Sequence, residues 1–207
     1  GTGAGRGRGG PHRSGPSQVG GGPIGRANGR ETVFPKAQDI QRELQVAGLR
    51  VTLDEREERP GWKFAEWELR GVPLRLEIGP KDIEKSAVMV ARRDTREKAS
   101  LPMENLPAQL TALLDAIQQN LLDRAVAFRD EHTQRVASYD EFKQGMAGRP
   151  RFGIGTWCGP AECEAQIKTE TQATIRNMPL NPSAPSGRFI RCDREAQHGE
   201  AWFAKSY

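Results

Sequence analysis

Apolar side chains between residues 35 and 103 change repeatedly between helical and strand spacing. From Pro35 to Ala47 they recur every three or four residues, which predicts a helix that ends before Gly48. Pro60 and Gly71 bracket a second, shorter helix. Segments in which apolar and polar residues alternate, or apolar residues cluster between turn signals, are predicted to be strands: 49–53, 74–78, 86–91 and 98–103. The pattern therefore predicts a mixed α/β sheet.

The second half of the chain repeats this mixture on a smaller scale. Beyond Asn105 the helical period continues as far as Phe128, which predicts one long helix that bridges two domains. The elements predicted after it are helices at 139–146 and 161–171, strands at 152–157 and 201–205, and a turn-rich loop at 181–187. A second α/β domain is therefore expected.

Composition narrows the classes of protein that fit. None of the 207 residues lies in an apolar run of about 18, the length of a membrane span, and the N-terminus has no contiguous hydrophobic signal segment. We expect a cytoplasmic protein with no membrane partner. The net charge of +4 comes from residues 1–30, which hold five arginines and no acid; the remainder has 26 basic and 27 acidic residues. Any nucleic-acid contact of the folded part must therefore be a local patch.

Residues 1–22 form a glycine- and arginine-rich segment that is expected to be disordered or aberrant. Twelve of the 23 glycines lie in residues 1–30, beside almost no large apolar side chain that could offset the entropy of ordering. Gly5, Gly7 and Gly10 match the spacing of a dinucleotide-binding loop, but no strand precedes them and no helix follows, so a dinucleotide-dependent enzyme is disfavoured. An Arg-Gly-Gly triplet at residues 8–10 resembles weak RNA-binding segments, although an inert tail is the simpler interpretation.

Several ungapped sequence blocks resemble one known family. They are Arg59-Pro60-Gly61-Trp62-Lys63-Phe64, Glu66 to Pro73, Glu77-Ile78-Gly79-Pro80-Lys81-Asp82, Ala127-Phe128-Arg129, Trp157-Cys158-Gly159 and the ending Phe203 to Tyr207. In this order they resemble the archaeal and eukaryote-like form of prolyl-tRNA synthetase, over its anticodon-binding and C-terminal domains. The resemblance implies a five-stranded mixed sheet flanked by helices at residues 23–119, the class II anticodon-binding fold, and a small α/β C-terminal domain at residues 120–207.

The resemblance also implies a function, which is recognition of the anticodon of proline tRNA. By resemblance, Glu68, Arg75, Lys81 and Asp82 occupy the anticodon-reading positions. The last two bases of this anticodon are guanines. Guanine has both hydrogen-bond acceptors and donors on its edges, so its recognition calls for cations together with carboxylates. Trp62 or Phe64 are candidates to stack on a base. Spacing alone favours a solvated charged face that carries a surface salt bridge, and the resemblance reverses this preference.

Three cysteines are the candidate metal ligands. An odd number of cysteines without a secretory signal argues against a disulfide framework and for free thiols or a metal site. Cys158, Cys163 and Cys192 offer three of the four ligands that a structural zinc ion requires. By resemblance the fourth ligand belongs at Phe189, and His198 is a possible substitute. Bound zinc and a lapsed site with inert thiols both remain open.

The family's catalytic machinery is not found in these residues. The resemblance implies a class II core upstream that uses ATP, so the segment alone should neither bind ATP nor activate proline, and no residue is assigned a catalytic role. Dimerisation is expected of the parent, because class II cores pair. A stand-alone RNA-binding or accessory protein with an anticodon-binding fold is the alternative.

One departure from the family lies directly before Pro23. The family expects a valine-rich strand where this chain has Val19-Gly20-Gly21-Gly22. Valine codons begin GT and glycine codons GG, so GTG triplets read out of frame encode glycine. We hypothesise that residues 1 to about 22 are a frameshifted stretch. As written, the segment is expected to leave the sheet one strand short, with apolar surface exposed on the neighbouring strands.

Overall fold

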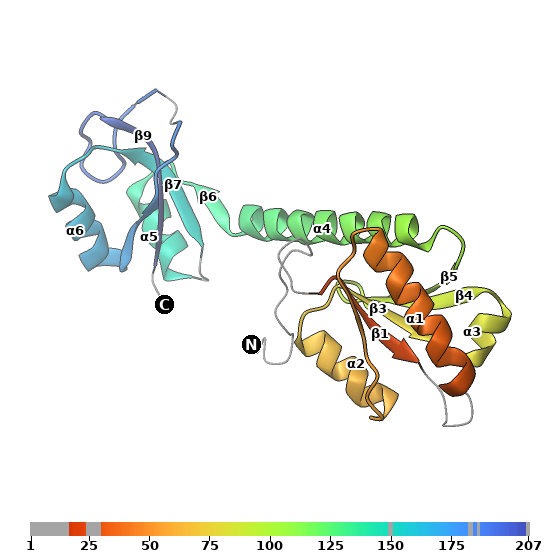
Figure 1. Ribbon diagram of the computed structural model, residues 1–207. Helices are drawn as coiled ribbons and strands as arrows, with labels where there is room; N and C mark the ends of the chain where they lie inside the picture. Colours follow the sequence, from red (N-terminus) through yellow and green to blue (C-terminus); the bar gives the residue numbers. More distant parts are fainter. Residues whose placement is uncertain (1–16, 24–29, 149–150, 182–183, 186, 206–207) are drawn as a thin grey trace. The chain divides into compact units, whose positions relative to one another are not determined.

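The computed structural model describes residues 17–23, 30–148, 151–181, 184–185 and 187–205. Two compact units are present, one extending to Arg124 and the other beginning at Ala125 (Figure 1). Helix α4, Leu106–Glu131, contains this boundary, and the domain limits predicted after residues 22 and 119 stay predictions. Within the described ranges, no helix combines the length and apolar character that crossing a bilayer requires. The glycine loop at residues 5–10 and its Arg-Gly-Gly triplet lie outside the described residues.

A five-stranded mixed sheet forms the first unit, which confirms the predicted fold class. The strands lie in the order β2-β1-β3-β4-β5, with β1 parallel to β2 and β3, and with β3, β4 and β5 antiparallel. Their bounds are Val19–Pro23 for β1, Val51–Leu53 for β2, Leu74–Ile78 for β3, Ala87–Arg92 for β4 and Lys98–Pro102 for β5. The helices are α1, Arg30–Val46, α2, Pro60–Leu69, α3, Pro80–Glu84, and α4.

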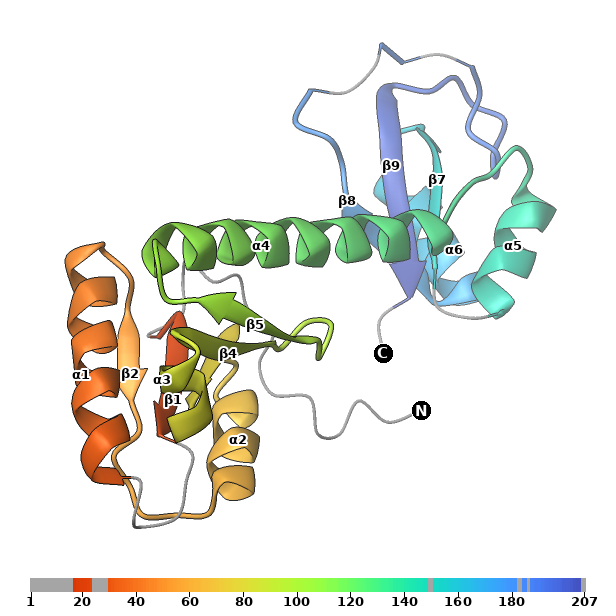
Figure 2. The same cartoon turned by 90° about the vertical axis from the view of Figure 1, so that its right-hand side faces the viewer.

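Helices α1 and α4 cover one face of this sheet, and α2 lies against the other. The alternating residues Leu74, Leu76 and Ile78 of β3 are buried together with the apolar residues of α1 and α4. Trp67 of α2 packs on the opposite face, where a Cβ atom at Gly20 would come within 2.9 Å of its ring. Figure 2 shows α1 and α2 on opposite sides of the strands. Lys98 and Ser100 of β5 are exposed on this second face, so the ten-residue helix α2 leaves part of it uncovered.

The expectation that the sheet lacks a strand at residues 19–22 is wrong. Val19–Pro23 forms β1, which pairs with β2 on one side and with β3 on the other. Backbone groups make these pairings whatever the side chain, and the one large apolar residue, Val19, is fully buried. At Gly21 an added Cβ atom would stand 2.3 Å from the carbonyl oxygen of Leu76, so the neighbouring strand lies too close for a side chain. The frameshift hypothesis concerns the nucleotide sequence and stays a prediction.

Two local elements also differ from the expectation. Helix α1 begins at Arg30, so Pro35 lies inside the helix rather than at its start. Pro80–Glu84, where the sequence pattern predicted no helix, forms helix α3. This short helix forms because the carboxylate of Asp82 accepts a hydrogen bond from the backbone N–H of Gly79 at 2.8 Å, which caps the first turn.

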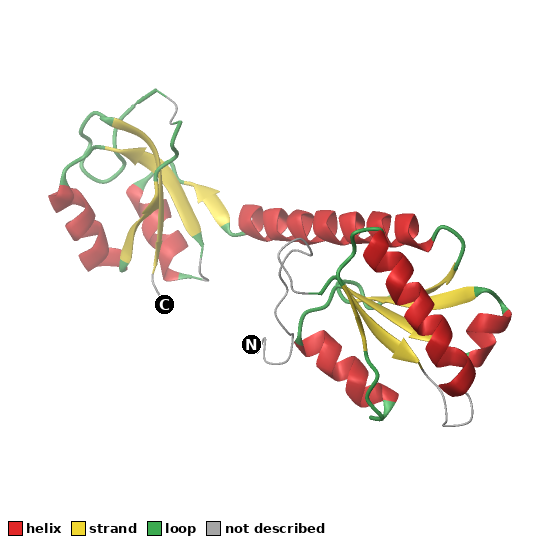
Figure 3. Ribbon diagram, viewed as in Figure 1, coloured by secondary structure: helices red, strands yellow, loops and turns green. Residues whose placement is uncertain are grey.

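The second unit is a smaller α/β fold, as predicted. Its four strands lie in the order β6-β7-β9-β8, and helices α5, Tyr139–Ala147, and α6, Ala161–Thr171, accompany them (Figure 3). The strand bounds are Thr133–Arg135 for β6, Phe152–Trp157 for β7, Ala173–Asn177 for β8 and His198–Lys205 for β9. An aromatic core of Phe142, Trp157, Phe189 and Phe203 fills the unit. Strands β6 and β8 were not predicted, because such short segments show little alternation.

Candidate nucleic-acid interface and metal centre

A row of polar side chains lies on the uncovered face of the first sheet. Arg75 of β3 is paired with Ala91 of β4, and Ala91 with Lys98 of β5. Residues that stand opposite one another project from the same face of a sheet, so this register places the two cations on either side of a small residue. Glu77, two residues after Arg75, lies on the same face. The polar residues of β3 therefore face away from the α1 and α4 layer.

Glu77 is the centre of a charge network on this face. Its side chain is only 6% exposed and accepts hydrogen bonds from Arg75, at 2.9 and 3.1 Å, and from Lys98, at 2.9 and 3.1 Å. Arg75 also reaches Glu68 at the end of α2, with 3.2 Å between Nη1 and Oε1. The carboxylate of Glu68 is 53% exposed and Arg75 itself 11%. The buried carboxylate thus fixes Arg75 in place, while Glu68 keeps acceptor capacity toward solvent.

Phe64 of α2 supports the same cluster. The guanidinium carbon of Arg75 lies 4.1 Å from the centre of the Phe64 ring, and the ammonium of Lys98 lies 5.4 Å from it. Both distances are typical of cation–π contacts. Phe64 is half-buried, whereas Trp62 is 51% exposed beneath the guanidinium of Arg56. Of the two aromatic candidates, Phe64 belongs to the charged cluster and Trp62 offers the more open ring.

A hollow of about 120 Å³ opens beside the cluster. Its lining comes from the end of α2, the start of β3 and the turn between β4 and β5: Trp67, Glu68, Val72, Arg75, Ala91, Arg92, Arg93, Arg96 and Lys98. Five of these nine residues are cationic, and one is a carboxylate. The first unit therefore concentrates positive charge at one place. Because the folded part of the chain is nearly neutral overall, a contact with nucleic acid needs such a local patch.

The four predicted anticodon-reading residues fall into two pairs. Glu68 and Arg75 meet directly, whereas Lys81 and Asp82 lie on α3, beyond the opposite end of β3. Among the described residues, no hydrogen bond or ion pair links one pair with the other. Lys81 is exposed, and Asp82 uses one carboxylate oxygen to cap its own helix. The sequence analysis did not assign Lys98 to the site, since its place opposite Ala91 follows only from the pairing of β4 with β5.

A buried carboxylate holds α2 against the sheet. The side chain of Asp54 is 1% exposed and accepts hydrogen bonds from Arg56, at 2.7 and 2.9 Å, and from the indole of Trp67, at 3.0 Å. Lys63 lies 3.7 Å away. Burial raises the pKa of Asp54, but the hydrogen bond from Arg56 and the charge of Lys63 outweigh it and hold the pKa below its ordinary value. Asp54 thereby fixes the helix that carries Phe64 and Glu68.

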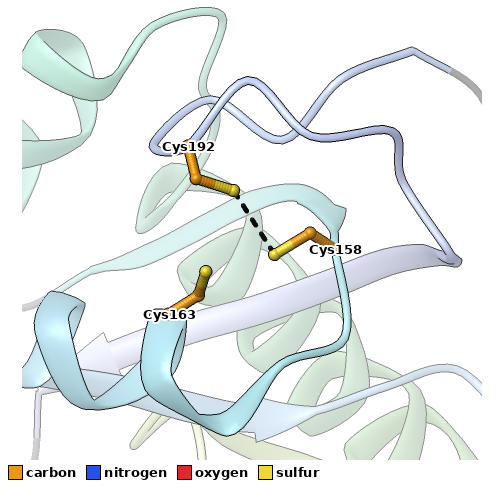
Figure 4. Close-up of side chains that lie close together, drawn as sticks. All are labelled: Cys158, Cys163 and Cys192. Atoms are coloured by element: carbon orange, nitrogen blue, oxygen red, sulfur yellow. Dashed lines mark hydrogen bonds between the residues drawn. The ribbon is translucent and has the colours of Figure 1, made fainter.

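The three cysteines meet in the second unit. Cys158 directly follows β7, Cys163 lies on α6 and Cys192 lies in the loop between β8 and β9, and their thiols point toward one another (Figure 4). The sulfur atoms all lie within 4.8 Å of one another, and the thiols of Cys158 and Cys192 share a hydrogen bond with 3.6 Å between their sulfur atoms. Of the described residues that could bind a metal, these three form a cluster. Three predicted ligands, 34 residues apart at the extremes, are thus brought together.

Burial has different consequences for two of these thiols. It raises the pKa of Cys158 to about 12, with the neighbouring thiols adding to the effect. Burial also raises the pKa of Cys192, but hydrogen bonds from the backbone of Arg194 and from the other thiols outweigh it, so the net direction is downward. Cys192 is therefore the first of the pair to become a thiolate, the form that binds metal.

The position of the fourth ligand is filled by an apolar side chain. Phe189 is 1% exposed and packs edge to face on Trp157, with 5.1 Å between the ring centres. His198 begins β9 and is exposed; its Nε2 lies 3.5 Å from the point where a Cβ atom of Gly159 would stand. It therefore lies near the backbone that follows Cys158 but is not part of the cysteine cluster.

Two family models match the chain. Residues 18–113 match the anticodon binding domain, and residues 139–207 match the C-terminal domain of prolyl-tRNA synthetase. The first range contains the open sheet face with its charge network, and the second contains all three cysteines. Because the first match begins at residue 18, it includes the glycine-rich strand β1.

Curated relatives match nearly the whole chain. A proline–tRNA ligase of Symbiobacterium thermophilum is 41% identical over 204 residues, which are 95% of this chain and 42% of that protein. The ligase of Acetoanaerobium sticklandii is 44% identical over 198 residues, 95% of this chain and 40% of that protein. The ligase of Rubrobacter xylanophilus is 46% identical over 198 residues, 95% of this chain and 41% of that protein. The chain thus spans about two fifths of the length of these relatives.

Proposed function

Because the chain belongs to the prolyl-tRNA synthetase family, as its anticodon-binding and C-terminal portion, we propose that it recognises the anticodon of proline tRNA through the open face of its first sheet. The observation that carries this proposal is the contact between Arg75 and Glu68 at the edge of a cationic hollow. A cation and a carboxylate side by side can serve a base that has acceptors and donors on neighbouring edges. The segment acts by binding, and we assign no catalytic residue in it.

Guanine suits this arrangement in detail. The guanidinium of Arg75 can donate to O6 and N7 of a guanine, and the exposed carboxylate of Glu68 can accept from its N1–H and N2–H groups. Because the buried Glu77 holds Arg75 in position, little side-chain entropy remains to be lost on binding. Phe64 restricts the same guanidinium from its other side. Adenine, which presents a donor in place of O6, would face the arginine with the wrong group.

The second pair is suited to a second base. The four residue steps from Arg75 to Gly79 span about 13 Å of strand, so Lys81 and Asp82 lie too far away to share one base edge with Glu68. Two successive guanines must therefore be unstacked and splayed along β3. Protein recognition of single-stranded RNA commonly proceeds in this way.

A binding experiment tests the proposal. Filter binding compares an anticodon stem-loop that carries the two guanines with stem-loops in which either guanine is replaced by adenine. We expect the wild-type chain to prefer the first RNA, and Glu68→Gln and Lys81→Ala each to reduce the preference at one base by about 1–3 kcal/mol. Arg42→Gln, on the far side of the sheet, is the matched control. Equal affinity of the wild-type chain for all three RNAs would refute the proposal.

The remaining steps of the family's reaction are proposed for the whole protein. Joined to a class II catalytic core, this portion would present proline tRNA for attachment of proline with ATP, in a cytoplasmic enzyme that dimerises through the core. ATP would bind to that core. Aminoacylation is therefore expected only when the core is supplied, and attachment of proline by the isolated chain would contradict this division of labour.

We further propose that the cysteine cluster holds a structural zinc ion. Three thiols within 4.8 Å of one another provide the sulfur donors that zinc prefers, and His198 is the candidate for the fourth ligand. The ion would tie α6 and the loop between β8 and β9 to the end of β7. Elemental analysis of the purified chain should find one zinc per chain, and Cys163→Ser should abolish it. Retention of zinc by His198→Ala would exclude that histidine, and absence of zinc from the wild type would leave the cysteines as thiols.

A further inference from the structure

The turn between β4 and β5 carries cations that the reading of bases does not use. Arg92, Arg93 and Arg96 line the hollow together with Arg75 and Lys98. Glu77 holds Arg75 and Lys98 in place, and Arg75 is the cation of the proposed base reading. The arginines of the turn therefore require a different explanation.

Contacts within the turn hold Arg92 in place, whereas Arg96 is exposed to solvent. Arg92 makes a bidentate contact with Asp94, at 2.7 and 3.1 Å, and Asp94 is held in turn by Asn120 at 2.7 Å. Burial raises the pKa of Asp94, but the hydrogen bonds from Arg92 and Asn120 and the charge of Arg92 together outweigh it, so the net direction is downward. For Arg96, which is exposed on a residue with φ of 65°, the described contacts include no ion pair.

We propose that Arg93 and Arg96 form a phosphate-binding site for the RNA backbone that flanks the bases read by Glu68 and Arg75. This inference rests on the proposed function. The guanidinium group is planar and presents paired donors, a geometry that matches phosphate oxygens. The turn borders the same hollow as the Glu68–Arg75 pair, so a base bound there brings its own phosphates toward the arginines. Such contacts position the RNA and carry no sequence information.

The two kinds of contact differ in their dependence on salt. Each phosphate contact that is lost lowers the slope of log K against log salt concentration by about one, because fewer counterions are released. A contact with a base edge changes affinity at one base and leaves that slope nearly unchanged. Salt dependence and base preference therefore report separately on the two proposals.

The experiment compares the full 207-residue chain with three variants. Affinity for the anticodon stem-loop is measured at several salt concentrations for Arg93→Gln/Arg96→Gln, for Glu68→Gln and for Arg42→Gln as the control on α1. For the double variant, we expect the slope of log K against log salt concentration to fall by up to two. Its affinity for the cognate stem-loop and for the adenine-substituted stem-loops should fall by the same factor. Glu68→Gln should keep the slope and lose the preference. Circular dichroism melting checks that each variant is folded.

A modified RNA identifies the contact directly. Neutral methylphosphonates replace the phosphates on either side of the guanines, one at a time. At one or both of these positions we expect the wild-type chain to lose affinity about tenfold and the double variant to lose little, because its partner for that phosphate is already absent. An unchanged slope in the double variant, or equal losses for both proteins at every position, would overturn the inference. If Glu68→Gln keeps the base preference while the arginine effects appear, the proposed reading fails and the phosphate site stands.

Discussion

Single buried charges decide how the reading face is built. Glu77 holds Arg75 and Lys98, and Asp54 holds α2 through Trp67 and Arg56. A buried carboxylate is stable only when its partners offset the loss of hydration, and both residues have several donors. The exposed residues Glu68 and Lys81 need no such support and remain available to a ligand.

Replacement of Asp54 by asparagine tests this view. Asp54→Asn should lower the free energy of unfolding by about 3 kcal/mol at pH 7, because it leaves the charge of the buried Lys63 without a counter-ion. Urea unfolding measures the loss. Glu66→Gln, which removes a more accessible partner of Arg56, should cost less than about 1 kcal/mol.

The effect of Asp54→Asn on the free energy of unfolding should depend on pH. The pKa of Asp54 is lower in the folded chain than its ordinary value near 4, so its contribution is fully present above about pH 4 and is lost as the pH falls through the folded pKa. Asparagine does not titrate. The difference in unfolding free energy between wild type and Asp54→Asn should therefore narrow from pH 7 to pH 3, and a constant difference would contradict the role of the carboxylate.

Strand β1 shows how an element can form without side chains. Three successive glycines lie between β2 and β3, and the pairing depends on their backbone N–H and C=O groups. Glycine loses more entropy on folding than other residues, so the strand has a cost that buried Val19 and the flanking strands must offset. The close approach of Leu76 to Gly21 means that a valine strand would require a wider sheet.

Substitution of Gly21 separates these possibilities. Gly21→Ala should destabilise the first unit by about 1–3 kcal/mol, as expected for overpacking against a backbone atom. Chemical denaturation provides the measurement. Gly61→Ala, where an added Cβ meets no atom within 4 Å, should cause no loss. A gain in stability from Gly21→Ala would instead show that β1 and β3 move apart readily. The sheet could then accept the valine-rich strand that the frameshift hypothesis assumes at this position.

At the scale of the whole molecule, the described residues form two separate hydrophobic clusters. One is built from aliphatic residues of the first sheet with α1 and α4, and the other combines four aromatic rings with smaller side chains that include Cys158 and Cys163. No residue belongs to both clusters among those described. Each unit should therefore have a stability of its own, and damage to one core should leave the other intact.

A core substitution in the second unit tests this independence. Phe203 is 1% exposed and contacts the rings of Phe142, Trp157 and Phe189. Phe203→Ala should destabilise the second unit by about 3–5 kcal/mol. Hydrogen exchange read by mass spectrometry should show faster exchange in β7 and β9 and unchanged protection in β3 and β4. Faster exchange in all four strands would indicate that the units unfold together.

The sequence by itself determined most of the elements. Helices α2, α4, α5 and α6 and strand β3 follow from periodicity and from the Pro and Gly residues at their ends, because these signals depend only on neighbours within one segment. The sequence blocks around Glu68, Arg75, Lys81 and Asp82 likewise helped to identify the family, which the C-terminal family model and the similar proline–tRNA ligases bear out. The carboxylates and cations that suit guanine could be identified from the same sequence blocks.

Only the tertiary structure decided which of these residues meet. Lys98 joins Glu77 across 21 residues, Cys192 reaches Cys158 across 34, and β1 lies between β2 and β3 although its glycines carry no pattern. Each of these contacts depends on strand pairing between distant segments, and no local period encodes such pairing. The division of the four candidate residues into two pairs is more local, because the length of β3 separates Glu68 and Arg75 from Lys81 and Asp82 on α3.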